Sequence, residues 1–142
     1  MNDSGPTPPP TFPQIELKEV FKILEQAESI PWKPFREGVD IHHFYGDGLT
    51  GPSAALIRFR QEARVPLHYH QGWEHILVLA GSQRDQSGVI HAGTLRIHAP
   101  GTHHSVISDA GCIVLAIYEK PVRFLEEKSA GSAEAQPEIS RA

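Results

Sequence analysis

Between residues 39 and 121 the chain alternates short apolar segments with turn residues, and this pattern restricts the fold more than any other feature. The apolar segments cover 39–45, 54–60, 65–70, 74–79, 89–92, 94–98, 104–108 and 112–118. Glycine or another turn-forming residue follows most of them, so that a turn comes about every eight to twelve residues. Eight or nine short strands at this spacing predict an all-β sandwich or barrel. The run 113–117 lacks polar alternation, which is typical of a strand covered on both faces.

The two ends of the chain differ from this middle part. Residues 1–14 hold five of the twelve prolines and predict an extended or disordered arm. Residues 15–30 predict one short amphipathic α-helix, whose apolar face needs cover at a barrel mouth or at a subunit interface. The apolar positions, spaced by three and four, are Leu17, Val20, Phe21, Leu24 and Ala27. Because Pro31 prevents the helix from continuing, the barrel is expected over 31–127, and the small polar residues of 128–142 predict a disordered tail.

Length, charge and cysteine content exclude several classes of protein. A chain of 142 residues fits one domain, and a formal net charge of −4 offers no basic excess for binding nucleic acid. No signal peptide is visible at the N-terminus. The longest apolar stretches, such as 76–80, are too short to span a bilayer, so we expect a cytoplasmic location without membrane contact. The single cysteine, Cys112, excludes an internal disulfide and is expected to be an inert buried thiol.

The residues that carry chemistry concentrate in 65–76, in a chain that holds nine histidines. His68 and His70 alternate along a strand and therefore share one face. Gly72 permits a tight reversal, after which the chain is expected to return as the antiparallel partner of the first strand. This return would place Glu74 opposite the two imidazoles, which makes a set of two histidines and one carboxylate.

A second segment, 93–104, supplies a turn and a further histidine, His104. With the side chain of His104 inward, the set contains three nitrogens and one carboxylate oxygen. Such a set suits one divalent ion of iron, manganese or zinc, and also nickel or cobalt.

Other histidines and aromatic residues receive structural interpretations. His75 and His103 each adjoin a candidate ligand in sequence, so strand alternation places both outside the barrel. Strand parity leaves open whether His42 or His98 lines the cavity. Three aromatic residues are interpreted as barrel packing rather than as substrate platforms: Phe59, Tyr69 and Trp73.

The spacing of these residues resembles two sequence motifs of the cupin superfamily. His68-x-His70-x3-Glu74-x6-Gly81 resembles the first motif, and Gly93 through Pro100-Gly101-x2-His104 resembles the second. The likeness covers roughly residues 40–120 and is closest to the ChrR-like cupins. Their second motif reads Gly-Thr, then Pro-Gly-Ser/Thr-x-His, then a Gly-Cys strand, and this chain has the three parts in that order at 93–94, 100–104 and 111–112.

The resemblance implies a single-domain cupin, a double-stranded β-helix that forms homodimers. In such a protein the metal ligands would be His68, His70, Glu74 and His104. The chain departs from the family pattern at Glu62, where a glycine is usual, but this position adjoins no candidate ligand. ChrR itself is an anti-sigma factor with a separate zinc-binding module, and this sequence lacks the His-x3-Cys-x2-Cys of that module. Sigma-factor binding is therefore not expected to carry over.

Two functions fit such a metal site. Four protein ligands on iron or manganese leave about two open positions for a substrate or dioxygen. By analogy with small cupins that cleave diketones or hydroxyacetophenones, this favours a dioxygenase acting on a small carbonyl substrate, a diketone or an aryl ketone. A zinc ion with the same four ligands is tetrahedral and closed, which favours a sensor or regulatory module without turnover. Binding of a small ligand without turnover is the third alternative.

Overall fold

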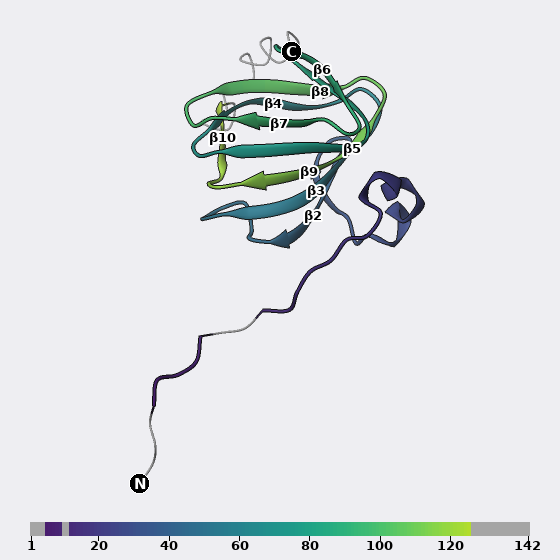
Figure 1. The fold of residues 1–142 in the computed structure, drawn as a ribbon. Helices are drawn as coiled ribbons and strands as arrows, with labels where there is room; N and C mark the ends of the chain where they lie inside the picture. Colours follow the sequence, from purple (N-terminus) through teal and green to yellow (C-terminus); the bar gives the residue numbers. More distant parts are fainter. Residues whose placement is uncertain (1–4, 10–11, 126–142) are drawn as a thin grey trace.

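The computed structural model describes residues 5–9 and 12–125, and these residues form an all-β fold (Figure 1). The predicted tail, 128–142, and the beginning of the predicted arm lie outside the described residues. The strands are β1 (Lys33–Arg36), β2 (Val39–Tyr45), β3 (Ser53–Phe59), β4 (Ala63–His70), β5 (Glu74–Asp85), β6 (Gly88–His91), β7 (Leu95–His98), β8 (His103–Ser108), β9 (Cys112–Tyr118) and β10 (Val122–Phe124). No helix among these residues is long and apolar enough to cross a membrane.

The strands form a curled antiparallel sheet in the order β1-β2-β3-β9-β5-β8-β4-β10. Strand β5 joins the two walls of the barrel. Its first part pairs with β9 and β7, and its last part pairs with β6 and β8. As a result, residues at the start of β5 face residues of β4 and β8 across the interior.

A β-bulge keeps β5 continuous where the sequence predicts a turn. The expected end at 80–81 is wrong, because the strand runs on to Asp85. The register against β9 shifts between Val78 and Ala80, and Gly81 follows with φ +77°. A bulge inserts one residue and reverses the inward alternation. Even-numbered residues from Glu74 to Val78 are therefore buried before the bulge, and odd-numbered residues, Gln83 and Asp85, are buried after it.

The amphipathic segment forms two short 3-10 helices instead of the predicted α-helix. They are η1 (Val20–Glu25) and η2 (Ala27–Ser29). Glu19 has φ 52° and caps η1 with no side-chain hydrogen bond, and Lys22 departs from helical geometry. An α-helix of this length is only marginally stable without good caps or extensive packing. Here the caps are weak and few side chains are buried.

The 3-10 segment covers the outer face of the sheet rather than a barrel mouth. Ile23 and Ala27 are its buried residues, and they pack with Leu56, Leu79 and Ile113 of strands β3, β5 and β9. Figure 1 shows this segment beside the lower right of the barrel, with residues 12–19 leading away from it. The run 113–117 lacks polar alternation because both faces of this strand are covered. The 3-10 segment packs on the outer face, and Val114 and Ala116 face the inner core.

The sulfur of Cys112 is expected to resist thiol reagents in the folded protein. Cys112 is buried at the start of β9, and burial raises the pKa of its thiol from 9.0 to about 11. At pH 8 the thiolate fraction is then about 100-fold lower than for an exposed thiol of ordinary pKa. A chromogenic disulfide reagent should label the native protein slowly and the urea-unfolded protein quickly. Equal rates in both states would contradict the assignment.

Candidate metal centre

Two cross-strand pairs of polar side chains face each other inside the barrel. His68 of β4 pairs in register with His104 of β8, and Glu74 of β5 pairs in register with His98 of β7. His70 lies two residues beyond His68 on the same face. The ligand atoms of four buried residues lie within 4.8 Å of one another, and these residues are His68, His70, Glu74 and His104. The structure thus brings together all four candidate ligands.

The route by which Glu74 reaches the imidazoles differs from the expectation. Among the described residues β4 and β5 form no strand pair; β4 pairs with β8 and β10. The prediction of a direct antiparallel return is therefore wrong, and the connection crosses from one wall to the other. Gly72 does not use the positive φ that glycine permits. Its role is space, because a Cβ there would lie 2.8 Å from Oε1 of Glu119.

Hydrogen bonds fix which nitrogen of His68 and His70 faces the centre. Nδ1 of His68 lies 2.8 Å from the carbonyl oxygen of Pro66, which can only accept. Nδ1 of His70 lies 2.9 Å from Oγ1 of Thr102, whose hydroxyl donates to the carbonyl oxygen of Ala99 at 2.7 Å. Both Nδ1 atoms therefore carry the proton, and both Nε2 lone pairs point inward.

A carboxylate orients the third imidazole. Nδ1 of His104 donates to Oδ2 of Asp85 at 2.7 Å. The other oxygen of Asp85 accepts from Nη1 of Arg96 at 3.1 Å and from the backbone N–H of Ser87 at 2.8 Å. Carboxylates commonly hold metal-binding histidines in this way. Asp85 is a residue that the sequence interpretation missed, and its only signal was alternation with Gln83 after an unrecognised bulge.

The protonation states match those of a metal site. Burial, helped by His104, lowers the pKa of His68 to about 3, and burial also lowers the pKa of His104. Burial alone would raise the pKa of Glu74, but the adjacent imidazoles of His70 and His98 hold it below its ordinary value. Neutral imidazoles beside an ionised carboxylate are the forms that bind a cation.

Three buried polar atoms at the centre face one another without hydrogen bonds. Nε2 of His70 lies 3.1 Å from Oε1 of Glu74, and Nδ1 of His98 lies 2.8 Å from the same oxygen. None of the three atoms has a hydrogen-bond partner among the described residues. Buried polar atoms of folded proteins nearly always have one. The Nε2 lone pair of His70 and the carboxylate oxygen of Glu74 converge in a way that fits a divalent metal ion, whereas His98 forms an ion pair with this carboxylate.

Of the two histidines whose orientation the sequence left open, one faces the site. His98 faces it, and its ring lies 4.4 Å from that of His104. Burial acts to lower the pKa of His98, but the carboxylates of Asp85 and Glu74 raise it to about 9 and so favour positive charge there. His42 instead packs edge-on against Phe44, which belongs to the outer cluster under the 3-10 segment.

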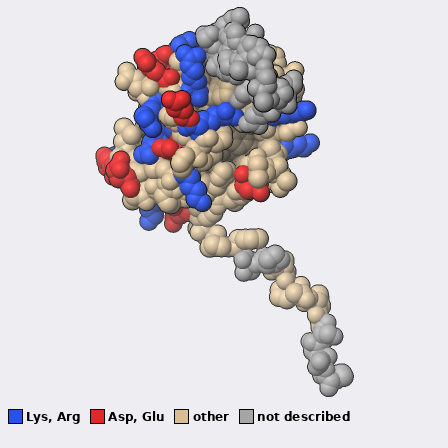
Figure 2. Space-filling model, turned by 180° about the vertical axis from the view of Figure 1, so that it is seen from behind, with Lys and Arg blue, Asp and Glu red and all other residues tan. Residues whose placement is uncertain are grey.

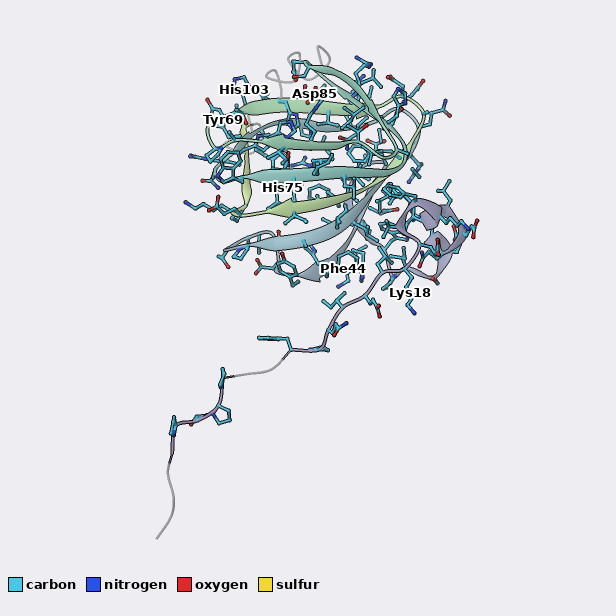
Figure 3. The ribbon with its side chains drawn as sticks, viewed as in Figure 1. Lys18, Phe44, Tyr69, His75, Asp85 and His103 are labelled. Atoms are coloured by element: carbon cyan, nitrogen blue, oxygen red, sulfur yellow. The ribbon has the colours of Figure 1, made fainter. Side chains whose placement is uncertain are left out.

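The outward residues are also placed. His103 is exposed beside Tyr69, and Figure 3 shows both at the outer edge of the barrel, with His75 on the outer face of β5. Tyr69 and Trp73 are 40% and 48% exposed, so their interpretation as barrel packing is wrong. Both lie at outward positions near the β4–β5 connection. Phe59 is buried in the inner core, as that interpretation requires.

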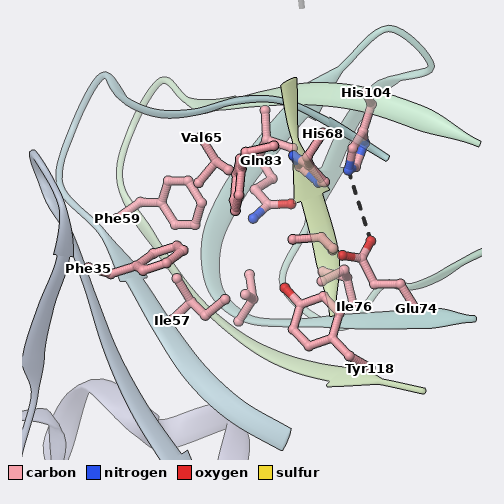
Figure 4. Close-up of a pocket in the computed structure, with 14 residues that line it drawn as sticks. Phe35, Ile57, Phe59, Val65, His68, Glu74, Ile76, Gln83, His104 and Tyr118 are labelled. Atoms are coloured by element: carbon pink, nitrogen blue, oxygen red, sulfur yellow. Dashed lines mark ion pairs between the residues drawn. The ribbon is translucent and has the colours of Figure 1, made fainter. Parts of the chain in front are cut away.

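An apolar cavity of about 50 Å³ adjoins the centre (Figure 4). Its apolar walls come from both sides of the barrel: Phe35, Ile57, Phe59, Val65, Ile76, Val106, Val114, Val122 and Phe124. His68, Glu74 and His104 also line it. Two polar side chains complete the lining, Gln83 and Tyr118, and the Tyr118 phenol points inward beside Glu74. Burial and the Glu74 carboxylate raise the pKa of Tyr118, so its hydroxyl is a hydrogen-bond donor.

Replacing Asp85 with asparagine is expected to weaken metal binding about 10- to 100-fold. Asp85→Asn keeps the side chain's shape but removes the charge that holds the proton on Nδ1 of His104. Competition with a chromophoric chelator measures the change. The matched control is Asp109→Asn, which removes the same charge from an exposed ion pair with Arg84. Equal affinities of the two variants would show that Asp85 does not support the site.

The outer surface has mixed charge. Figure 2 shows acidic and basic side chains interspersed among uncharged ones over one face of the molecule. This distribution agrees with the net charge of −4.

Comparisons with known proteins place the fold and the family. The family model described as the ChrR Cupin-like domain matches residues 21–122. Anti-sigma-E factor ChrR of Cereibacter sphaeroides is 39% identical over 62 residues, which are 42% of this chain and 29% of that protein. The chain thus matches less than a third of the length of this curated relative.

Solved structures of cupins are similar to this fold. An RmlC-like cupin protein from Ralstonia eutropha JMP134 gives a TM-score of 0.61 at 25% identity, over 70% of this chain and 69% of that one. An acetylacetone dioxygenase from Acinetobacter johnsonii gives 0.67 at 15% identity, over 98% of each chain. The fold is therefore an all-β cupin fold. Because the family model also matches most of the chain, the protein belongs to the ChrR Cupin-like domain family.

Proposed function

We propose that this protein is a metal-dependent oxidoreductase of the dioxygenase type that acts on a small carbonyl compound, a diketone or an aryl ketone. The observation that carries the proposal is the apolar cavity beside the cluster of His68, His70, Glu74 and His104. A metal site that only stabilises a fold needs no such cavity, whereas a binding site for a small organic molecule combines apolar walls with a few polar groups.

Different residues of the cavity would bind the metal and the substrate. The imidazoles of His68, His70 and His104 and the Glu74 carboxylate would hold iron or manganese, which supplies Lewis-acid and redox chemistry toward dioxygen. The walls formed by residues such as Phe59 and Val106 bind the hydrocarbon part of the substrate and exclude water. The Tyr118 hydroxyl, which lines the cavity, donates its hydrogen bond to the Glu74 carboxylate and so orients this ligand.

The size of the cavity limits how much of a substrate can enter it. A volume of about 50 Å³ accepts roughly four water-sized groups. An outer groove of about 420 Å³ shares four lining residues with the cavity: Phe35, Tyr118, Val122 and Phe124. The carbonyl end of a substrate thus fits the inner cavity, and the remainder extends into this groove.

The second candidate function is a zinc-binding sensor module without turnover. Its support is the family match to ChrR, an anti-sigma factor. The identity of the metal separates the two candidates, because zinc with four protein ligands leaves no position for a substrate.

The test begins with elemental analysis of protein purified without added metal, followed by oxygen-uptake assays with diketones and aryl ketones. The enzyme proposal expects iron or manganese and oxygen uptake that depends on one of these substrates. Val106→Phe, which fills the cavity, should keep the metal and lose uptake. The control Ile117→Phe enlarges an exposed side chain and should retain both. Stoichiometric zinc without uptake would favour the sensor module instead.

A further inference from the structure

Gln83 differs from the other polar side chains that line the inner cavity. Among the described residues the polar part of this lining consists of three candidate metal ligands, Tyr118 and Gln83. The Tyr118 hydroxyl is engaged by the Glu74 carboxylate. Gln83 is 8% exposed, and Figure 4 shows its amide pointing into the cavity. Gln83 is therefore the polar side chain of this lining that is not engaged at the metal cluster.

The β-bulge in β5 directs the side chain of Gln83 inward. After the bulge, Gln83 and Asp85 are the buried positions of the strand. Residues two apart on a strand share a face and lie about 7 Å apart, so the amide is one step along β5 from the carboxylate that orients His104. Ile90, the register partner of Gln83 on β6, is buried in the inner core. A paired strand thus holds the amide beside the cluster.

The amide of Gln83 has hydrogen-bonding capacity that the described residues do not use. A glutamine amide offers two N–H donors and one carbonyl acceptor. The hydrogen-bonding partner of this side chain is the buried thiol of Cys112, and sulfur is a weak partner. Buried polar groups nearly always have a partner, and the apolar walls of the cavity supply none. The remaining capacity of the amide is therefore directed at a molecule in the cavity.

We propose that Gln83 determines the specificity of the cavity for a small dicarbonyl compound, a β-diketone, by hydrogen-bonding the oxygen that does not face the metal cluster. This inference rests on the proposed function and narrows its substrates from diketones and aryl ketones to dicarbonyl compounds. An amide donates to a keto oxygen and accepts from an enol hydroxyl. Gln83 can therefore bind a β-diketone in its keto and in its enol form.

A ketone with a single oxygen would leave the Gln83 amide unpaired. Such a ketone would direct its oxygen to the cluster and present only hydrocarbon to the amide, while it displaces water from the cavity. Leaving a buried polar group without a partner lowers affinity by about 10- to 100-fold. Sites built to hydrogen-bond a substrate reject analogues that lack the bonding group for this reason. The cavity should therefore distinguish two ketones of the same carbon skeleton.

The experiment measures binding of two such ketones to the cobalt-loaded protein by calorimetry, with dioxygen excluded. They are pentane-2,4-dione and pentan-2-one, which lacks the second oxygen. We expect the wild type to bind the diketone at least about tenfold more tightly than the monoketone. Gln83→Met, which keeps the length of the side chain, should retain cobalt and lose about tenfold or more in affinity for the diketone alone. The control Gln61→Met changes an exposed glutamine between β3 and β4 and should match the wild type.

The failure of this inference is distinguishable from the failure of the proposed function. An unchanged affinity of Gln83→Met for pentane-2,4-dione, or an equal loss for both ketones, would overturn the role of Gln83 and leave the proposed function intact. A wild type that binds cobalt but neither ketone would overturn the proposed function as well. Equal affinities of the wild type for the two ketones would overturn the role of Gln83 even if Gln83→Met fails to fold.

Discussion

Replacing His68 and His104 together with alanine is expected to reduce the metal content from near-stoichiometric to background. The two imidazoles form one cross-strand pair, and both present Nε2 to the centre. Four ligands of a structural zinc site share about 10–16 kcal/mol, or roughly 3 kcal/mol per ligand, so each loss weakens binding about 10²-fold or more. Elemental analysis of protein purified without added metal measures the result.

The matched control exploits strand alternation. His75 and His103 adjoin Glu74 and His104 in sequence, but both side chains point out of the barrel. The double variant His75→Ala/His103→Ala removes the same number of imidazoles and should retain full metal content. Full occupancy in His68→Ala/His104→Ala would mean that the metal binds elsewhere, and the proposed ligand set would be abandoned.

The four candidate ligands were predictable because their geometry depends on short-range rules. Alternation along one strand places His68 and His70 on the same face whatever the remaining topology. The Pro-Gly turn before His104 fixes the start of the next segment in the same way. These features survive an error in strand pairing, which is why Glu74 reaches the site although β4 and β5 do not pair.

The placement of Asp85 and of His98 could not be predicted, because both depend on long-range register. The bulge after Val78 reverses the parity of β5, and nothing local to residues 82–85 records that reversal. His98 meets Glu74 only because β7 pairs with the first half of β5. When the strand partners are unknown, alternation alone cannot tell whether His98 or His42 faces the interior.

The prediction of the short elements at the edges of the fold failed for a different reason. The strands β1 and β10 have four and three residues, too few for alternation to be recognised. In the segment 15–30 the predicted apolar face is only partly confirmed, because Ala27 is buried but Phe21 and Leu24 are 58% and 69% exposed, and the fully buried residue, Ile23, was not among the predicted positions. The 3-10 geometry agrees with the weak capping, which periodicity alone does not reveal.

Replacing Gly81 with alanine is expected to destabilise the barrel by about 3 kcal/mol or more, or to prevent folding. The positive φ of +77° alone costs an alanine about 1–2 kcal/mol. The added Cβ would also lie 2.0 Å from the carbonyl oxygen of Gly111 and 2.9 Å from Cα of Cys112. Both contacts are with backbone, so β5 and β9 would have to separate where Gly81 pairs with Cys112. Urea unfolding followed by fluorescence measures the loss.

Gly93→Ala separates the steric effect from the backbone strain. Gly93 also has a positive φ, +92°, but a Cβ there would meet no atom within 4 Å. Its loss should therefore stay near about 1–2 kcal/mol, the strain of the left-handed conformation alone. Because the bulge at Gly81 turns Gln83 and Asp85 inward, any folded Gly81→Ala protein should also bind metal less tightly than Gly93→Ala. Equal stability and equal metal affinity in the two variants would show that the close approach of β5 to β9 is not what requires glycine.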